Sequence, residues 1–315
     1  PSRGLGDVYK RQEYLFHAMF SVMLFCMVFM LYPRASISAK RIMAVLNTET
    51  SIENHPGNAQ TDSGSGEHSV IFEHVDFVYP DGEEAVLKDI SFSAKSGETV
   101  AFIGSTGSGK SSLIQLIPRF YDRASGNIYI DGQKIEDLDI NALRSKIGFV
   151  PQKAHLFSGT IEENIRFGKP DATMDEIIHA AKIAQAYDFI MEKPHQFQEQ
   201  IVEGATNVSG GQKQRLSIAR ALIRKPEIYI YDDSFSALDF KTDARLRKAL
   251  KPEIKNAIVF LVAQRVSTIL DADKIVVLDE GKIAGIGTHR ELLASCPIYY
   301  EIAASQLSKE ELTYA

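Results

Sequence analysis

Residues Gly104 to Ser111 read GSTGSGKS and match the pattern G-x-x-x-x-G-K-[ST], with an apolar run before them and a helix-compatible run after them. Glycines in such a loop let backbone N–H groups curl around nucleotide phosphates, and the positive end of the following helix favours their charge. Lys110 adds a point charge, and the Ser111 hydroxyl is a ligand for Mg²⁺. The segment therefore predicts a nucleoside triphosphate site. Its predicted contacts are Gly104, Ser105, Thr106, Gly107, Ser108, Gly109, Lys110, Ser111 and Ser112.

A second segment, IYIYDD at residues 228–233, is an apolar run that ends in two carboxylates. An apolar strand that ends in Asp is common and mostly structural when it stands alone. Downstream of a phosphate-binding loop, however, it is where such enzymes place the carboxylate that holds Mg²⁺. We therefore predict Asp232 as the metal-side residue, followed directly by Asp233.

Between these segments lies NVSGGQKQRLSIARAL, residues 207–222, in which small residues open a helix whose N-terminal amides can bind an anion. This run resembles the ABC signature motif, usually LSGGQ, with Val in the place of Leu. The matching residues are Val208, Ser209, Gly210, Gly211 and Gln212. The resemblance to ABC nucleotide-binding domains extends over nearly the whole chain from Tyr14.

Three further motifs carry this resemblance. Tyr79 in FVYPDG matches the aromatic residue that stacks on adenine, and Gln152 in FVPQKAHLFSGT matches the glutamine of the Q-loop. The D-loop matches Ser236, Ala237, Leu238 and Asp239. The resemblance implies ATP and Mg²⁺ as cofactors, with Ser111, Gln152 and Asp232 on the metal. It also implies a head-to-tail pair of domains, in which each ATP lies between the phosphate-binding loop of one subunit and the signature of the other.

Two positions depart from the family pattern. Asp233 stands where the family has a Glu base, and Gln264 in LVAQRVS stands where it has a His that contacts the γ-phosphate. Asp is shorter by one methylene, and a misplacement of about 1 Å costs on the order of 10²-fold in rate. Gln cannot act as a cationic partner. Asp233, Gln264 and Gln152 are the predicted catalytic positions.

This combination resembles the degenerate subunit of heterodimeric multidrug ABC exporters, whose own site turns ATP over slowly while its signature serves a Glu-bearing partner. A homodimeric exporter that tolerates Asp and Gln is the alternative. A soluble ABC protein of translation or DNA repair is a third reading, and the apolar run at residues 14–32 together with the single nucleotide domain argues against it.

The elements that must position these residues alternate between short β-rich and helical runs from Val70 onward, which indicates an α/β fold. The resemblance specifies a P-loop NTPase with a RecA-like core, a β subdomain and a helical subdomain, the last near residues 173–191. We expect the ATP-binding domain at residues 70–305, a Gly/Ser-rich linker at residues 47–69, and a C-terminal tail at residues 306–315.

Residues 14–32 are nearly all apolar and have about the length of a membrane span. Pro33 and Arg34 follow, with Lys40 and Arg41 beyond, and positive charge marks the cytoplasmic side. We therefore expect residues 13–46 to be the end of a membrane domain in contact with lipid, with its cytoplasmic extension, in a multi-pass protein of the plasma membrane. The junction resembles the exit from the sixth membrane helix of exporters, and residues 1–12 resemble a translated sequencing adapter.

The composition of the 315 residues, 44% hydrophobic and 24% charged, is that of a globular chain. A net charge of −6 with scattered Lys and Arg argues against a nucleic-acid partner. The two cysteines, Cys26 and Cys296, have no metal-ligand spacing and predict neither a disulfide framework nor a zinc site.

Overall fold

The computed structural model describes residues 3–48, 50, 52–54, 68–307 and 312. The chain divides into two units, residues 1–53 and 54–315, and each is described by itself. Most of the expected linker, residues 55–67, and most of the expected tail lie outside the described residues.

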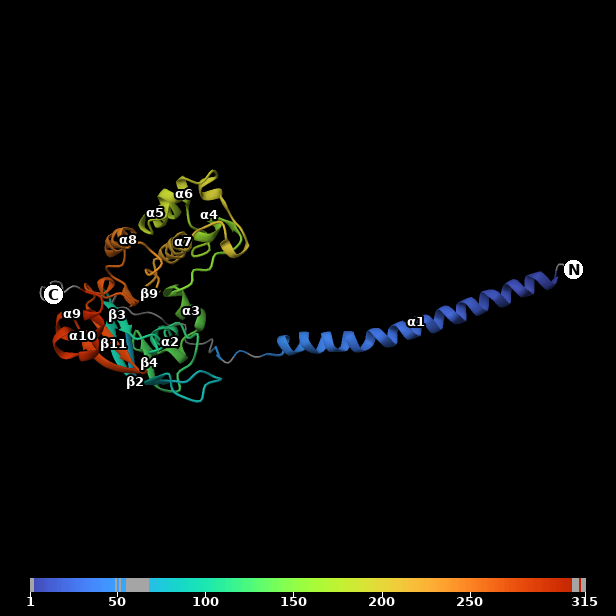
Figure 1. Ribbon diagram of the computed structural model, residues 1–315, viewed down its shortest axis with the longest axis horizontal. Helices are drawn as coiled ribbons and strands as arrows, with labels where there is room; N and C mark the ends of the chain where they lie inside the picture. Colours follow the sequence, from blue (N-terminus) through green and yellow to red (C-terminus); the bar gives the residue numbers. More distant parts are fainter. Residues whose placement is uncertain (1–2, 49, 51, 55–67, 308–311, 313–315) are drawn as a thin grey trace. The chain divides into compact units, whose positions relative to one another are not determined.

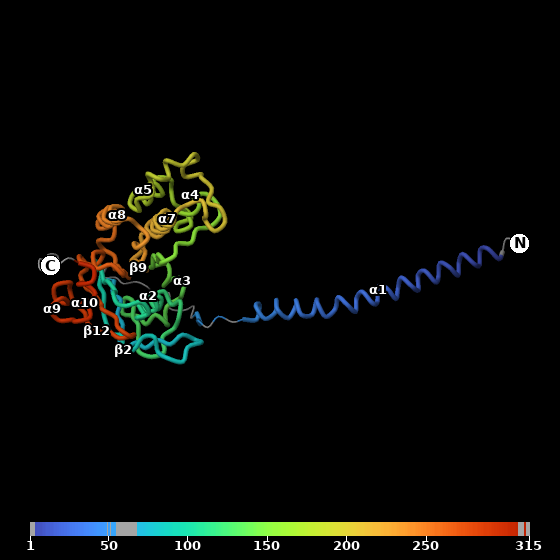
Figure 2. Tube along the Cα trace, in the orientation of Figure 1, coloured from blue at the N-terminus to red at the C-terminus, as the bar shows by residue number. Residues whose placement is uncertain are grey.

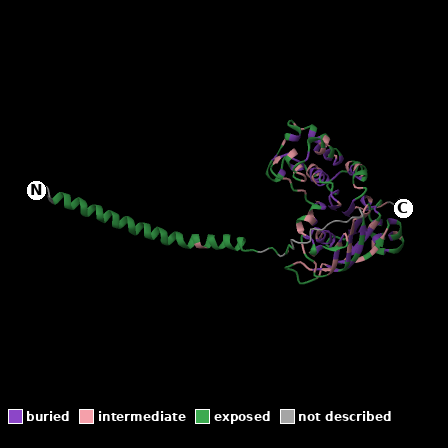
Figure 3. Cartoon of the chain, turned by 180° about the vertical axis from the view of Figure 1, so that it is seen from behind, coloured by how far each residue is buried: buried purple, intermediate pink, exposed green. Residues whose placement is uncertain are grey.

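The first unit is dominated by helix α1 (Arg3–Leu46), whose described side chains are almost all exposed (Figure 3). Within the described part of the chain it is the one helix long and apolar enough to cross a membrane, with a mean hydropathy of 2.1 in its most apolar window. At 1.5 Å per residue its 44 residues extend about 66 Å, roughly twice the hydrocarbon thickness of a bilayer. The helix continues through Pro33, so neither residue 12 nor residue 32 is an element boundary (Figure 2).

The second unit contains an antiparallel sheet of spatial order β2-β1-β4-β5. Its strands are β1 (Ser69–Phe77), β2 (Leu87–Lys95), β4 (Ser125–Ile130) and β5 (Gln133–Lys134). Polar and apolar residues alternate along β2, as expected for a sheet with one face on a core. This sheet is the expected β subdomain.

A six-stranded sheet of order β12-β11-β3-β10-β9-β6 forms the centre of the second unit. All its pairings are parallel except that between β11 and the edge strand β12. Its strands are β3 (Thr99–Gly104), β6 (Ile147–Val150), β9 (Ile228–Asp232), β10 (Ile258–Val262), β11 (Lys274–Asp279) and β12 (Lys282–Gly287). Strands β9 and β10 are buried throughout, as a sheet covered on both faces requires.

Helices cover this sheet, and α4 to α7 group together as the expected helical subdomain (Figure 1). The bounds are α2 (Lys110–Leu116), α3 (Ile140–Ser145), α4 (Ile161–Arg166), α5 (Met174–Ile183), α6 (Tyr187–Met191), α7 (Gly210–Leu222), α8 (Phe240–Glu253), α9 (His289–Ser295) and α10 (Pro297–Ala304). Short 3₁₀ turns are η1 (Ile135–Asp137), η2 (Gln196–Gln198), η3 (Glu203–Ala205) and η4 (Val266–Thr268), and β7 (Gly159–Thr160) pairs with β8 (Gln200–Ile201).

Two hydrophobic cores lie on opposite faces of the central sheet. Because side chains alternate along β9, Ile228 and Ile230 join the core shared with the antiparallel sheet, while Tyr229 and Tyr231 join the core shared with the helical subdomain. The architecture confirms the predicted α/β P-loop fold and places the ends of β3, β9 and β10 at one edge of the sheet.

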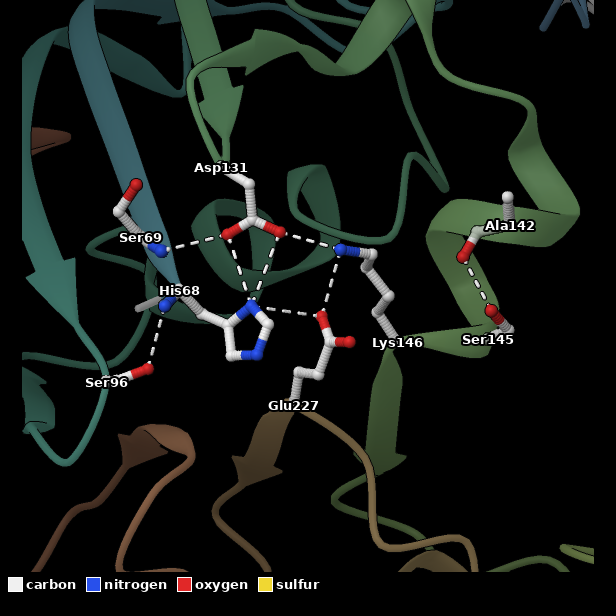
Figure 4. Close-up of polar contacts among 8 residues, drawn as sticks. All are labelled: His68, Ser69, Ser96, Asp131, Ala142, Ser145, Lys146 and Glu227. Atoms are coloured by element: carbon white, nitrogen blue, oxygen red, sulfur yellow. Dashed lines mark hydrogen bonds and ion pairs between the residues drawn. The ribbon is translucent and has the colours of Figure 1, made fainter. Parts of the chain in front are cut away.

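An ionic cluster joins the two sheets near the start of β1 (Figure 4). The Lys146 ammonium lies 2.7 Å from Asp131 Oδ2 and 3.0 Å from Glu227 Oε2, and His68 Nδ1 lies 3.3 Å from Glu227. Burial alone lowers the pKa of Lys146, but its hydrogen bonds to the two carboxylates raise it overall. Asp131 follows β4, whereas Lys146 and Glu227 precede β6 and β9, so the cluster fastens the antiparallel sheet to the parallel one.

Candidate nucleotide-binding site

The phosphate-binding loop connects β3 to α2 and needs glycine for two steric reasons. A Cβ on Gly104 would lie 2.1 Å from the Leu278 carbonyl oxygen, because β3 packs directly beside β11. Gly109 has φ +96°, and a Cβ there would lie 2.6 Å from a methyl group of Leu87. Only glycine fits both positions, so the strand, the loop and the helix can form where the sequence predicts them.

Lys110, the first residue of α2, is buried inside the loop. Its Nζ donates hydrogen bonds to Ser105 O at 2.7 Å, Gly104 O at 3.0 Å and Ser108 Oγ at 3.2 Å. Burial lowers the pKa of Lys110, while the charges of Asp233 and Asp232 oppose that shift. The ammonium is thus fixed by the loop rather than by a carboxylate, which leaves it available to an anion.

The predicted metal side is formed where α2 meets the end of β9. Ser111 Oγ donates to Asp232 Oδ1 at 2.9 Å, and Asp232 is only 5% exposed. Burial raises the pKa of Asp232; the Ser111 hydrogen bond opposes this, and the neighbouring Asp233 adds to it. A hydroxyl and a carboxylate, with the Gln152 side chain lining the same cavity, supply the hard oxygen donors that Mg²⁺ prefers, so the residues fit the ion.

The predicted catalytic residues converge on a single oxygen atom. Gln264 Nε2 donates to Asp233 Oδ2 at 2.8 Å, and Gln152 Nε2 donates to the same oxygen at 3.2 Å. Burial raises the pKa of Asp233, against the lowering effect of the Gln152 hydrogen bond. Asp233 also has a left-handed backbone, with φ +46°, a conformation that Asp tolerates better than most residues.

A cavity of about 230 Å³ unites these groups. Its wall includes Gln152, Asp232, Asp233 and Gln264, together with Thr106, Gly107, Gly109, Lys110, Ser111 and Ser112 of the predicted phosphate-binding segment. The structure therefore brings together residues that are up to 158 positions apart in the sequence, from Thr106 to Gln264. Val86 and Val262 complete the wall, and sequence reasoning missed both because nothing in the sequence distinguishes them from other valines.

Tyr79 lies beside this cavity and outside its lining residues. Its hydroxyl is 2.8 Å from Ser112 Oγ, and its ring centroid lies 4.7 Å from that of Phe77 and 5.1 Å from that of Tyr121. These contacts hold the half-buried ring next to the phosphate-binding loop. A nucleobase role for Tyr79 stays a prediction.

The signature and D-loop residues also lie outside the cavity wall and adjoin each other. Ser209 caps α7 by accepting from Gln212 N, and a Cβ on Gly211 would lie 3.2 Å from the Ala237 carbonyl oxygen. Ser236 Oγ donates to Asp233 O at 2.8 Å, which ties the D-loop to the catalytic segment. Asp239 in turn caps α8.

One positioning residue escaped the sequence analysis. Gln214, on α7, is 2% exposed and donates to the Pro151 carbonyl oxygen at 3.1 Å. It therefore links the signature helix to the residue before Gln152. The polar residue at a buried helical position was the available signal, since buried polar groups need a partner.

Comparison with known proteins decides the family. The family profile described as ABC transporter matches residues 87–236, from β2 to the start of the D-loop. The chain carries an ABC transporter nucleotide-binding domain. Domains of this family bind ATP, typically with Mg²⁺.

The relatives of this ABC chain are longer than the chain itself. It is 43% identical over 309 residues to an uncharacterized ABC transporter ATP-binding protein of Bacillus subtilis, covering 98% of this chain and 53% of that protein. It is 48% identical over 237 residues to a putative multidrug export ATP-binding/permease protein of Staphylococcus aureus, covering 75% and 41%. The solved structure of a bacterial Atm1-family ABC exporter with ATP bound matches with a TM-score of 0.82 and 35% identity, covering 90% and 49%. The chain thus spans about half the length of the curated relatives it matches.

Proposed function

We propose that this chain is the ATP-binding part of an ABC exporter subunit, which couples ATP binding and hydrolysis to the export of a substrate across the plasma membrane. The similarity to a solved exporter supports this proposal, because it covers 90% of the chain, which is more than the nucleotide-binding domain alone. The apolar helix with basic residues beyond its apolar run supports a cytoplasmic nucleotide-binding domain. Lipid is then the natural surrounding of the apolar run at residues 14–32.

In this proposal each residue around the cavity of the nucleotide-binding domain has a role. Lys110 and the loop amides would bind the phosphates, and Ser111, Gln152 and Asp232 would hold Mg²⁺. The metal ion would neutralise phosphate charge when bound. ATP binding closes the dimer, hydrolysis and release reopen it, and the membrane pathway alternates its access accordingly.

We further propose that the site formed by this chain's own phosphate-binding loop is hydrolytically degenerate. The observation that carries this is the pairing of two neutral amides on Asp233 Oδ2. Asp233 is the residue placed to orient a water molecule, yet its carboxylate is one methylene shorter than the family's Glu and one of its oxygens is already engaged twice. Gln264 cannot contribute the positive charge of an imidazolium. The groups that would bind ATP are all present, whereas the groups that would promote attack by water are weakened.

The signature belongs to a different site in this proposal. Ser209 to Gln212 keep the residue types of the family signature, and Gly210 at the start of α7 is exposed. In a head-to-tail dimer they would complete the site of a Glu-bearing partner subunit. A homodimer would instead place them against a second copy of Asp233 and Gln264, and it is the alternative that the following measurements address.

ATP binding and steady-state ATPase should be measured on the full chain and on an Asp233→Glu/Gln264→His double variant. We expect tight ATP binding with almost no turnover in the unmodified chain, and turnover gained in the variant. Because Glu is longer than Asp by one methylene, the expected increase in the ATPase rate is on the order of 10²-fold. Brisk turnover by the unmodified chain alone would refute the degenerate site and favour a homodimer.

The role of the signature is tested in a reconstituted pair of this chain with a Glu-bearing subunit. Ser209→Arg should abolish the ATPase activity of the pair, because it places a bulky cation where the partner's phosphates would bind. Thr206→Arg is the matched control, since Thr206 is exposed just before α7 and outside the signature. Survival of activity in Ser209→Arg would contradict the proposed role in trans.

A further inference from the structure

A second cavity, of about 440 Å³, lies between helix α8 and the face of the central sheet that points away from the antiparallel sheet. Tyr231, Val259 and Leu261 form its floor, and Leu250 and Ile254 form part of its helical side. None of these residues lines the cavity around the phosphate-binding loop. Its volume falls within the range of about 300–1,000 Å³ typical of small-molecule sites.

One residue of this floor carries a hydroxyl group in need of a partner. Tyr231 is 1% exposed, and its hydroxyl makes no hydrogen bond within the described part of the chain. A buried polar group without a partner costs free energy that a bound acceptor would recover. Burial raises the pKa of Tyr231 well above its usual value, so the hydroxyl remains a neutral donor.

The rim of the cavity is cationic. Arg247, Lys248 and Lys251 of α8 line it, against one carboxylate from Asp271. Arg247 is engaged by Asp243 at 3.2 Å, whereas Lys248 and Lys251 are exposed and form no ion pair among the residues that the structure describes. An apolar floor with a basic rim is complementary to a molecule that has an apolar body and a negative end.

We propose that this cavity binds a small amphipathic anion, an aromatic carboxylate that carries an oxygen acceptor on its ring. The apolar body lies on Val259 and Leu261, the carboxylate faces Lys248 and Lys251, and the ring oxygen accepts from Tyr231. The site is separate from the ATP site, so the proposal stands independently of the transport function.

The experiment uses the full chain in lipid nanodiscs and 6-hydroxy-2-naphthoate as the ligand, with empty nanodiscs as the blank. The chain has no tryptophan, so naphthoate fluorescence anisotropy reports binding without an indole background. We expect saturable binding that Lys248→Glu/Lys251→Glu weakens by at least about tenfold. Arg245→Glu/Lys255→Glu makes the same charge change at exposed positions outside the cavity lining, and it should alter affinity by less than about twofold.

The hydroxyl is tested with a pair of ligands. Tyr231→Phe should weaken 6-hydroxy-2-naphthoate by about five- to tenfold and leave 2-naphthoate, which lacks the ring oxygen, unchanged. Retention of ATP binding and of the unfolding temperature shows that the variants are folded. Absence of saturable binding, an equal loss in both charge-reversed variants, or an equal loss of both naphthoates in Tyr231→Phe would overturn the proposal.

Discussion

Replacing Asp232 by Asn should stabilise the nucleotide-binding domain while removing its response to Mg²⁺. Asp232 is buried beside a second buried carboxylate, Asp233, and its pKa is raised chiefly by burial. The ionised carboxylate is therefore less favourable in the folded than in the unfolded chain. Asn has the same shape, and its carbonyl oxygen can still accept the hydrogen bond from Ser111.

The free energy of unfolding should rise by about 0.5–2 kcal/mol, as for a typical stabilising replacement at a functional site. For a domain of this size, about 1 kcal/mol shifts the unfolding temperature by about 2–4 °C, so we expect a rise of about 1–8 °C. The size of this gain depends on pH. A raised pKa in the folded state costs stability above that pKa, and the cost disappears as the pH falls through it. The advantage of the Asn variant over the unmodified chain should therefore shrink as the pH is lowered from 7.5 towards 3.8, the ordinary pKa of an aspartate.

The measurement is differential scanning calorimetry of the full chain without nucleotide and with a chelator present. Asp81→Asn is the control, because Asp81 is exposed and should give no shift. Isothermal titration with ATP, with and without Mg²⁺, checks the second half of the prediction: Mg²⁺ should no longer strengthen ATP binding by the variant. A lower unfolding temperature for Asp232→Asn, or an advantage that is independent of pH, would refute the reasoning.

Three further outcomes are expected. Lys146→Met leaves Asp131 and Glu227 facing each other, so it should cost about 2–3 kcal/mol in calorimetry, a deficit that Lys146→Arg avoids. Because the pKa of Asp131 is lowered overall by its hydrogen bonds despite burial, this deficit should shrink as the pH falls through that pKa. Gly109→Ala places a side chain at φ +96°, so it should lower the free energy of unfolding by about 1–2 kcal/mol. The same variant should also lose ATP binding, measured by titration. Ser209→Ala removes the cap of α7 and should cost about 1 kcal/mol, whereas Ser209→Asn should keep the unfolding temperature, and a loss equal to that of Ala would contradict the capping role.

The sequence alone determined the elements that depend on local pattern. The loop after β3, the apolar strand before Asp232 and the glycines of the signature are recognisable because backbone geometry and phosphate chemistry restrict which residues fit. The long apolar helix was likewise predictable from composition, although its extension back to Arg3 was not. Strands β4 and β6 were missed, since their short runs carry little periodicity.

Tertiary structure decided which distant residues act together. No local pattern places Gln152 and Gln264 on the same oxygen of Asp233, because that contact depends on the packing order of β6, β9 and β10 in a parallel sheet. The cavity beneath α8 is equally invisible in the sequence, where Tyr231 is one apolar-strand residue among several. A motif made of adjacent residues can be recognised in the sequence. A site assembled from the ends of separate strands, in contrast, depends on the order of those strands in the folded sheet.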